Sequence, residues 1–303
     1  MRAVVFEEFG GPEVLQVKDA KEPQAGQGEV RVAVKAAGVN PMDFKVRYGW
    51  FDSFMPTTFP AIPGAEVAGV VDQIGEGVTE FAVGDEVVGW SQGGSYAEYA
   101  LLGVATKKPA NVSWEEAVAV PVAGETAARV LNELGLKEGE TLLLHGAAGG
   151  VGSVGVQLAV ALGATVIGTA SEANHEYLRS LGAIPITYGE GLVDRVKEVA
   201  PQGVDAVFDA AGKGGLQESI ELRGGTDRIV TIADMAAGEI GVTVSSGGVA
   251  DDVKKAGLAE QVQLVADGKL KPAIAKTFTL DEARAAHGVS EAGHNRGKLV
   301  IVV

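Results

Sequence analysis

Apolar residues in the first hundred positions come in short runs, not at helical spacing. Val-rich segments are separated by glycine, proline and aspartate turns, at residues 2–6, 29–36, 67–71 and 86–89. Six prolines between positions 23 and 109 disfavour long helices in this part of the chain. The pattern therefore predicts a β-rich region up to about residue 108.

From about residue 110 the pattern alternates between strands and helices. Ser113 and Glu116 form a capping box at the start of this region. An apolar run at 141–145 leads into a glycine-rich turn at 146–152, and apolar residues then follow at helical spacing up to Leu162. Gly163 ends this helix, and further strands are predicted at 164–170, 183–188, 204–209 and 228–232. Such alternation predicts an α/β fold with a doubly wound parallel sheet of the Rossmann type.

Beyond about residue 245 the pattern is less regular. It predicts helices at 256–266 and 281–291 and a terminal strand at 298–303. The fold class expected for the whole chain is a Rossmann-type sheet together with a second, β-rich domain.

The amino-acid composition excludes several kinds of catalytic chemistry and several classes of partner. The 303 residues contain no cysteine, which excludes disulfides, thiolate catalysis and cysteine-ligated zinc. The net charge of −15 argues against nucleic acid or an anionic membrane as the main partner. No apolar run is long enough to cross a bilayer, and the first residues do not resemble a signal peptide. We therefore expect a cytoplasmic protein.

The glycine-rich turn predicts a dinucleotide site. Glycines between a strand and a helix let backbone amides approach a pyrophosphate, which the positive end of the helix dipole attracts. Here the turn has the form A-x-G-x-x-G, in which Gly149 permits close approach of the backbone and Gly152 permits close packing of the helix on the strand. The surrounding strand–turn–helix–strand context makes this motif specific.

The end of the following strand bears on the choice of nucleotide. An NAD site usually has an acidic residue there, which accepts a hydrogen bond from the ribose 2′-hydroxyl. This chain has Ser171 instead, which favours NADPH because a serine donates to a 2′-phosphate. Glu172 opposes a phosphate unless its side chain points away, and Arg179 is a candidate counter-charge.

Several longer segments resemble the zinc-independent quinone oxidoreductases, the zeta-crystallin-like branch of the medium-chain dehydrogenase/reductase superfamily. The resemblance covers essentially the whole chain and rests on the segments GVNPMDFKVRYG (38–49), FPAIPGAEVAGVV (59–71), VGDEVVG (83–89), GSYAEY (94–99), PVAGETAA (121–128), HGAAGGVGSVGVQLA (145–159) and RGKLVIV (296–302). It implies a GroES-like domain at 1–112, completed by 246–303, and a Rossmann NADP-binding domain at 113–245. The cofactor would lie in the cleft between them.

The resemblance also assigns residues to the cofactor NADPH. Asn40 would lie near the nicotinamide, and Thr126 would bind the cofactor from its own loop. The remaining expected contacts are Ala148, Gly149, Gly150 and Val151 at the pyrophosphate, Ser171 and Tyr188 at the 2′-phosphate end, Ile232, and Arg296 or Lys298 from the tail. Many relatives have a lysine two or three residues after the Ser171 position, where this chain has Ala173 and Asn174. Asn174, His175 or Arg179 would have to replace that lysine.

No metal is expected from the same comparison of motifs. Zinc-dependent relatives have a cysteine after the Gly-Val pair and a histidine in a Gly-His-Glu motif, and this chain has Asn40 and Ala65 there. Glu66 alone survives, either as a buried carboxylate satisfied by backbone groups or as an acid near the substrate. Asp43, Lys45 and Arg47 are interpreted as an ion-pair network.

The resemblance and the missing zinc ligands favour reduction of an activated acceptor. Reduction of a quinone or an α,β-unsaturated carbonyl compound by NADPH needs only a polarised carbonyl and a proton source. Asn40 would polarise the carbonyl and Tyr48 would donate the proton, while Tyr48, Trp50, Phe51 and Phe54 form either an apolar wall for the acceptor or ordinary core. The alternatives are an enoyl-thioester reductase and an NADPH-binding protein with little turnover. The resemblance further implies a homodimer that pairs through the sheet edge near 242–246.

Overall fold

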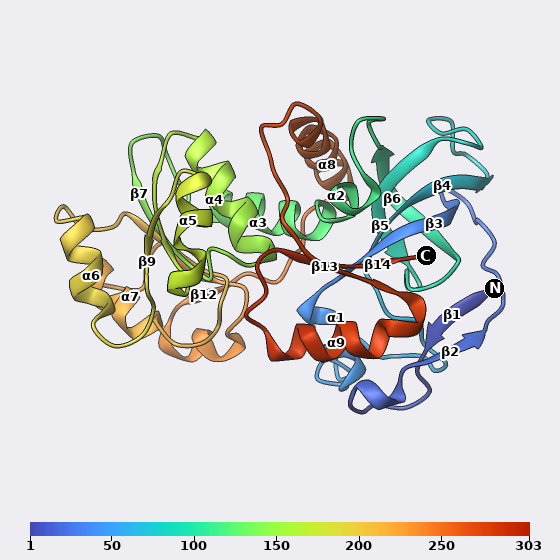
Figure 1. Ribbon diagram of the computed structural model, residues 1–303, viewed down its shortest axis with the longest axis horizontal. Coiled ribbons are helices and arrows are strands. Elements are labelled where there is room, and N and C mark those ends of the chain that lie inside the picture. Colours follow the sequence, from blue (N-terminus) through green and yellow to red (C-terminus); the bar gives the residue numbers. More distant parts are fainter. The chain divides into compact units, whose positions relative to one another are not determined.

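The computed structural model describes residues 1–303, and the chain forms two compact units (Figure 1). Unit 1 comprises residues 1–122 and 251–303, and unit 2 comprises residues 123–250. The sequence pattern and the family resemblance predict these boundaries at lower residue numbers, after residues 112 and 245. The first boundary moves because helix α2 (Trp114–Val118) contacts strands of unit 1, and its Val118 lies in the core of that unit.

Unit 1 is built on a six-stranded sheet, four strands of which close into a ring. The strand order is β13-β14-β3-β4-β5-β6, and an additional pairing joins β3 to β6. The strands are β3 (Val30–Val39), β4 (Glu66–Ile74), β5 (Glu86–Gln92), β6 (Tyr99–Lys107), β13 (Ile274–Thr279) and β14 (Lys298–Val302). Only the β13–β14 pair is parallel. The tail strand β14 pairs with β3, so residues from both ends of the sequence share one sheet.

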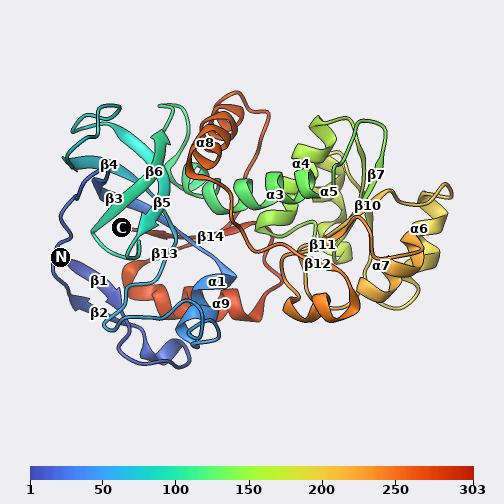
Figure 2. The same ribbon diagram turned by 180° about the vertical axis from the view of Figure 1, so that it is seen from behind.

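Short elements surround this sheet. A separate antiparallel pair, β1 (Arg2–Val5) with β2 (Gln16–Asp19), is followed along the chain by α1 (Pro41–Arg47). The tail contributes α8 (Asp251–Ala266) and α9 (Ala283–Ala292), and α9 contacts α1 and β14. The 3-10 turns of this unit are η1 (Pro12–Val14) and η4 (Leu280–Glu282). The view from behind shows α1 and α9 side by side, as their contacts require (Figure 2).

Unit 2 contains a six-stranded parallel sheet in the order β12-β11-β10-β7-β8-β9. Its strands are β7 (Thr141–His145), β8 (Thr165–Thr169), β9 (Ile184–Ile186), β10 (Ala206–Asp209), β11 (Ile229–Thr231) and β12 (Thr243–Val244). The chain moves outward from β7 to β8 and β9, and then crosses to β10 on the other side. The order therefore reverses between β7 and β10, which is where α/β sheets bind ligands.

Alternate side chains of these strands enter two separate cores, one on each face of the sheet. Leu142, Leu144 and Phe208 pack with helices α3 (Pro121–Glu133), α4 (Gly150–Ala161) and α5 (His175–Ser180). Leu143, Ile167 and Val207 pack on the opposite face with α6 (Leu192–Val199) and α7 (Leu216–Arg223). Both faces are covered, so the predicted doubly wound sheet is confirmed. The 3-10 turns here are η2 (Glu172–Asn174) and η3 (Met235–Ile240). No helix combines the length and the apolar composition needed to cross a membrane.

Candidate active site and cofactor site

The glycine-rich turn connects β7 to α4 as predicted. Gly149 is the N-cap of α4, and Gly146 has a positive φ of 70°. A Cβ atom at Gly152 would overlap the carbonyl oxygen of Gly146, so only glycine lets the helix approach the turn this closely. The first turn of α4 contains no acidic residue, and its leading amides have no partner within the helix. This arrangement suits an anionic pyrophosphate.

A second group of polar residues lies at the carboxyl end of β8. The Asn174 side chain donates a hydrogen bond to Ser171 Oγ over 3.1 Å, so the structure brings these two predicted residues together. Arg179 instead forms an ion pair with Glu176 at 2.5 Å. Glu172 is exposed, and Tyr188, which follows the neighbouring strand β9, is 55% exposed.

The other expected cofactor residues lie apart from this tip. Thr126 is buried on α3, where its hydroxyl donates to Glu125 at 3.4 Å, and Ile232 directly follows β11. His145, at the end of β7, contacts Ser219 Oγ at 2.9 Å. Burial lowers the pKa of His145, although the charges of Asp209 and Glu218 oppose this shift.

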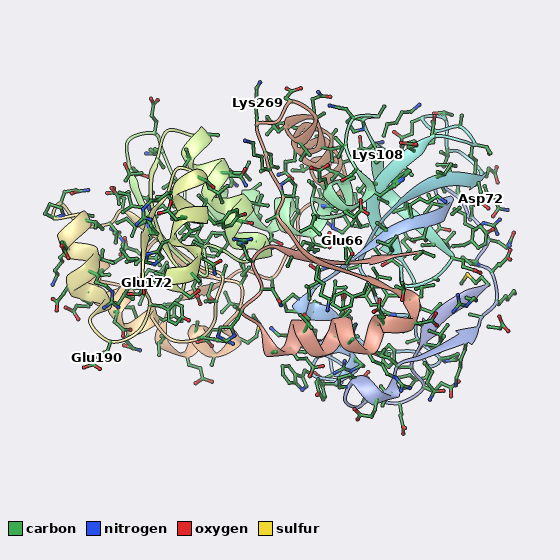
Figure 3. All side chains as sticks on the ribbon, viewed as in Figure 1. Glu66, Asp72, Lys108, Glu172, Glu190 and Lys269 are labelled. Carbon is green, nitrogen blue, oxygen red and sulfur yellow. The ribbon has the colours of Figure 1, made fainter.

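In unit 1 a buried ionic network joins three segments of the chain. Lys298 Nζ forms an ion pair with Glu66 and donates to Asn40 Oδ1 at 2.6 Å. Asn40 Nδ2 donates in turn to the same Glu66 carboxylate at 2.9 Å, and the amide of Val122 donates to its second oxygen at 2.8 Å. Glu66 is completely buried, and Figure 3 labels it within unit 1. The backbone contact predicted for Glu66 is present. Glu66 also binds Lys298, the lysine that the resemblance assigns to the cofactor phosphates.

Asp43 lies next to this network. Its Oδ2 accepts hydrogen bonds from the Asn40 amide at 2.8 Å and from the Tyr96 hydroxyl at 2.8 Å. Burial raises the pKa of Asp43 from 3.8 to about 6, against the lowering effects of these two hydrogen bonds and of Lys298. Burial and the adjacent Asp43 raise the pKa of Tyr96 well above its ordinary range. The structure therefore places Asp43 among hydrogen-bond donors and not in the ion-pair network expected for it.

A second buried cluster surrounds Arg47, whose side chain is completely buried. The guanidinium contacts His287 Nδ1 at 2.9 Å and forms an ion pair with Glu291 at 2.5 Å. Since arginine only donates, His287 Nδ1 accepts and the proton of a neutral ring lies on Nε2, which has no hydrogen-bond partner. Burial and the charge of Arg47 lower the pKa of His287 to about 3.

Tyr48 connects this cluster to an exposed aromatic surface. Its hydroxyl donates to Glu291 Oε2 at 3.2 Å, its ring stacks on Trp50 with centroids 5.6 Å apart, and the Arg47 guanidinium lies 4.6 Å from its ring centre. Trp50 is 60% exposed and Phe54 is 73% exposed. These two rings are therefore not core residues, whereas Tyr48 and Phe51 are half-buried.

Comparisons with known proteins agree with these features. Residues 26–128 match the alcohol dehydrogenase GroES-like domain, and residues 181–301 match the zinc-binding dehydrogenase family. The chain is 34% identical to a 2-methylene-furan-3-one reductase of Solanum lycopersicum, over 99% of this chain and 79% of that protein. It is 30% identical to the Homo sapiens quinone oxidoreductase, over 100% of this chain and 98% of that protein. The chain belongs to the quinone oxidoreductase branch of the medium-chain dehydrogenase/reductase superfamily. The Escherichia coli quinone oxidoreductase, solved in complex with NADPH, superimposes with a TM-score of 0.89 at 28% identity, over 100% of each chain.

The residues of this chain do not fit the zinc ion that one of these family names implies. Asn40 and Ala65 stand where zinc-dependent relatives have ligands, and the Asn40 amide is hydrogen-bonded on both sides. The Lys298 ammonium lies against Glu66, so a second cation would be repelled from the one remaining carboxylate. No group of three or more histidine, cysteine, aspartate or glutamate side chains is arranged to hold a metal ion.

Sequence reasoning missed several members of these clusters. Tyr96, His287 and Glu291 carried no assigned role in the site, although all three contact residues of the α1 segment. Glu291 is separated from Arg47 by 244 positions, so no local spacing connects them. No local pattern marks Arg47 as buried, because the α1 sequence PMDFKVR carries three charged residues.

Proposed function

We propose that this protein is an NADPH-dependent oxidoreductase that transfers hydride to a quinone or an α,β-unsaturated carbonyl compound without zinc. The observation that carries the proposal is the β7–α4 turn, whose close approach at Gly152 and non-acidic helix start suit a dinucleotide pyrophosphate. Membership of the quinone oxidoreductase branch supports the reaction class. NADPH, when bound, supplies the hydride from its reduced nicotinamide ring.

The proposed cofactor residues follow the sequence prediction with one change. The hydrogen-bonded Ser171 and Asn174 bind the 2′-phosphate, while Arg179 contributes only if it leaves Glu176. Lys298 is reassigned to the buried network of unit 1, because both Glu66 and Asn40 already hold its ammonium. The remaining proposed contacts are Thr126, Ala148, Gly149, Gly150, Val151, Tyr188, Ile232 and Arg296.

We propose that Asn40 and Tyr48 act on the acceptor. Asn40 Nδ2 gives one hydrogen to Glu66, and its second hydrogen is available to polarise a carbonyl. Lys298, on the opposite side of the amide, fixes which end of Asn40 is the donor. Tyr48 supplies the proton when its hydroxyl turns from Glu291 to the acceptor, and its ring extends from the buried cluster to the exposed Trp50. A flat acceptor stacks on Trp50 and Phe54.

Turnover tests this proposal directly. Anaerobic stopped-flow mixing with NADPH and either 1,4-benzoquinone or an enone should show loss of absorbance at 340 nm. Tyr48→Phe retains the stacking and the cation–π contact but lacks the hydroxyl, so it should lower kcat by roughly 100-fold and leave KM nearly unchanged. No hydride transfer to either acceptor class would refute the proposed function. An unchanged kcat in the variant would refute only the role of Tyr48.

Nucleotide choice can be tested at Glu172. Its carboxylate adjoins the proposed 2′-phosphate position, so Glu172→Gln should tighten NADPH binding by about threefold and leave NADH binding unchanged. Glu138→Gln is a matched control, because Glu138 is an exposed glutamate that precedes β7 at the opposite edge of the same sheet. Calorimetric titration of both nucleotides measures the effect. Tighter NADH binding by the unmodified protein would contradict the NADPH assignment.

We also propose a homodimer formed through the edge strand β12. This strand has a neighbour on one side only, so its other edge is open to a second copy of the chain. Light scattering coupled to gel filtration tests the proposal, and a monomeric mass at micromolar concentration would contradict it. The cytoplasmic location remains a prediction, which cell fractionation would test.

A further inference from the structure

A buried carboxylate at the end of β10 has a set of partners that the proposed reaction does not use. Asp209 is completely buried, and its Oδ1 accepts hydrogen bonds from the amides of Ala211 at 2.9 Å and Gly212 at 3.0 Å. Its Oδ2 accepts a hydrogen bond from the Thr231 hydroxyl at 2.7 Å. A buried carboxylate held by three donors and by no ion pair fixes the backbone that supplies those donors.

Thr231 extends this arrangement to the next loop. It ends the neighbouring strand β11, is completely buried, and accepts hydrogen bonds from the amides of Ala233 and Asp234, each at 3.2 Å. Four backbone amides from two loops, residues 210–215 and 232–234, therefore converge on one pair of side chains. Gly212 has a φ of 62°, and a Cβ atom there would lie 2.7 Å from the backbone of Ala233, so the two loops are in contact.

The strand order gives these loops a defined place in the proposed cofactor site. The order reverses between β7 and β10, and Ser171 and Tyr188 follow β8 and β9 on one side of that point. The loops after β10 and β11 lie on the other side, at the same carboxyl edge of the sheet. A dinucleotide binds across such a point with one half on each side. An adenosine half at Ser171 therefore places the nicotinamide half over loops 210–215 and 232–234.

We infer that Asp209 and Thr231 form a positioning pair that holds these two loops in the shape that binds the nicotinamide half of NADPH. The inference rests on the proposed function, since it assumes that NADPH is the ligand. Neither side chain touches the cofactor, because both are completely buried. The pair acts through the loops, so its loss should weaken only the half of the ligand that the loops contact.

The two halves of the ligand can be measured separately. Adenosine 2′,5′-bisphosphate contains the adenosine and the 2′-phosphate but no nicotinamide. Thr231→Val keeps the shape of the side chain but leaves Asp209 Oδ2 and the two loop amides unpaired. We expect this variant to bind NADPH at least about tenfold more weakly and the bisphosphate within about twofold of the unmodified protein. Thr231→Ser keeps the hydroxyl and should bind both ligands within about twofold. Calorimetric titration gives all of these dissociation constants.

A second substitution protects the test against misfolding. In Asp209→Asn the amide oxygen still accepts from Ala211 and Gly212, but its NH₂ group faces the Thr231 hydroxyl. That hydroxyl already accepts two hydrogen bonds, so the contact between the loops should weaken and the same selective loss should appear. Should Thr231→Val fail to fold, Asp209→Asn decides alone.

Two outcomes would overturn the inference, and a third would overturn the proposed function as well. Equal weakening of both ligands in Thr231→Val would mean that the pair supports the whole unit and not one half of the site. Unchanged NADPH binding in a folded Thr231→Val or Asp209→Asn would mean that the loops do not contact the nicotinamide half. An unmodified protein that binds neither NADPH nor the bisphosphate would refute the proposed function itself, independently of the variants.

Discussion

Replacing Asp43 by asparagine should make the stability of unit 1 increase as the pH rises from 4 to 6. In the unmodified protein two opposing effects nearly cancel over this range. Both hydrogen bonds to this carboxylate, from the Asn40 amide and the Tyr96 hydroxyl, end on the same oxygen. The carbonyl oxygen of an asparagine can accept both. The substitution therefore removes a buried titrating group and preserves its contacts.

The magnitude follows from the pKa of Asp43 in the folded state. Burial raises this pKa from 3.8 to about 6, so between these pH values the folded protein holds a proton that the unfolded chain has lost. The stabilisation from this proton is complete below pH 3.8 and is lost as the pH rises through 6. At about 1.4 kcal/mol per pH unit, the loss amounts to about 3 kcal/mol. Relative to the unmodified protein, Asp43→Asn should therefore gain about 2 kcal/mol between pH 4 and pH 7.

His287 has the opposite effect over the same range. Its pKa is lowered from 6.5 to about 3, so its contribution to stability is complete above pH 6.5 and is lost as the pH falls toward 3. Between pH 4 and 6 the two slopes nearly cancel. His287→Gln retains an acceptor for Arg47 and should show the reverse of the Asp43→Asn result, with stability that falls as the pH rises from 4 to 6.

Urea unfolding followed by tryptophan fluorescence measures these slopes at constant ionic strength. The three tryptophans of the chain, Trp50, Trp90 and Trp114, all lie in unit 1, which also contains Asp43 and His287. The signal therefore reports the unfolding of the unit under test. Curves of unfolding free energy against pH that run parallel for Asp43→Asn and the unmodified protein between pH 4 and 6 would refute the reasoning. They would mean that Asp43 titrates equally in the folded and unfolded states.

Three further substitutions test the buried network of unit 1, the cofactor turn and the N-cap of α2. Lys298→Met leaves the Glu66 carboxylate buried without its cation and should lower the unfolding free energy by about 3–5 kcal/mol. The double variant with Glu66→Gln should restore most of this loss, and urea unfolding measures both. Gly152→Ala places a methyl group against the Gly146 carbonyl, so calorimetry should detect no NADPH binding to a protein with a lowered Tm. Ser113→Ala removes the acceptor for the Glu116 amide and should lower stability by about 1 kcal/mol in the fluorescence assay.

The sequence predicted the fold best where structure is determined locally. The strand 141–145 matches β7 residue for residue, and the following helix ends beside Gly163 as expected. Strands β6 and β13 and helix α3 were not predicted. The sequence of β13, IAKTFT, has one buried residue among six, because β13 lies at the open end of the sheet. An edge strand of this kind has no apolar face that a hydrophobic pattern could reveal.

The two candidate sites differ in the same way: one is determined locally in the sequence and the other by long-range contacts. The cofactor turn is contiguous in sequence, so its glycine spacing was sufficient to predict its conformation. The buried network of unit 1 joins Asn40, Glu66 and Lys298, and the last of these is 258 positions from the first. The family resemblance assigns Lys298 to the cofactor phosphates, and a lysine in a tail strand carries no sign of any other partner. Only the pairing of β14 with β3 brings its side chain to Asn40.

The two sites should therefore tolerate substitutions differently. The cofactor turn depends on backbone geometry at a few glycines, so substitutions within it act directly on binding and cannot be compensated from elsewhere. The proposed acceptor side has a buried layer that contains Asp43, Arg47 and Glu66, and an exposed layer formed by Trp50 and Phe54. Tyr48 joins the layers, since its hydroxyl contacts Glu291 and its ring contacts Trp50. The exposed rings bury little surface and add little to folding, so they are free to vary with the shape of the acceptor. Arg47 and Glu66 are each paired with an opposite charge, Glu291 and Lys298 respectively, and neither is free to vary singly.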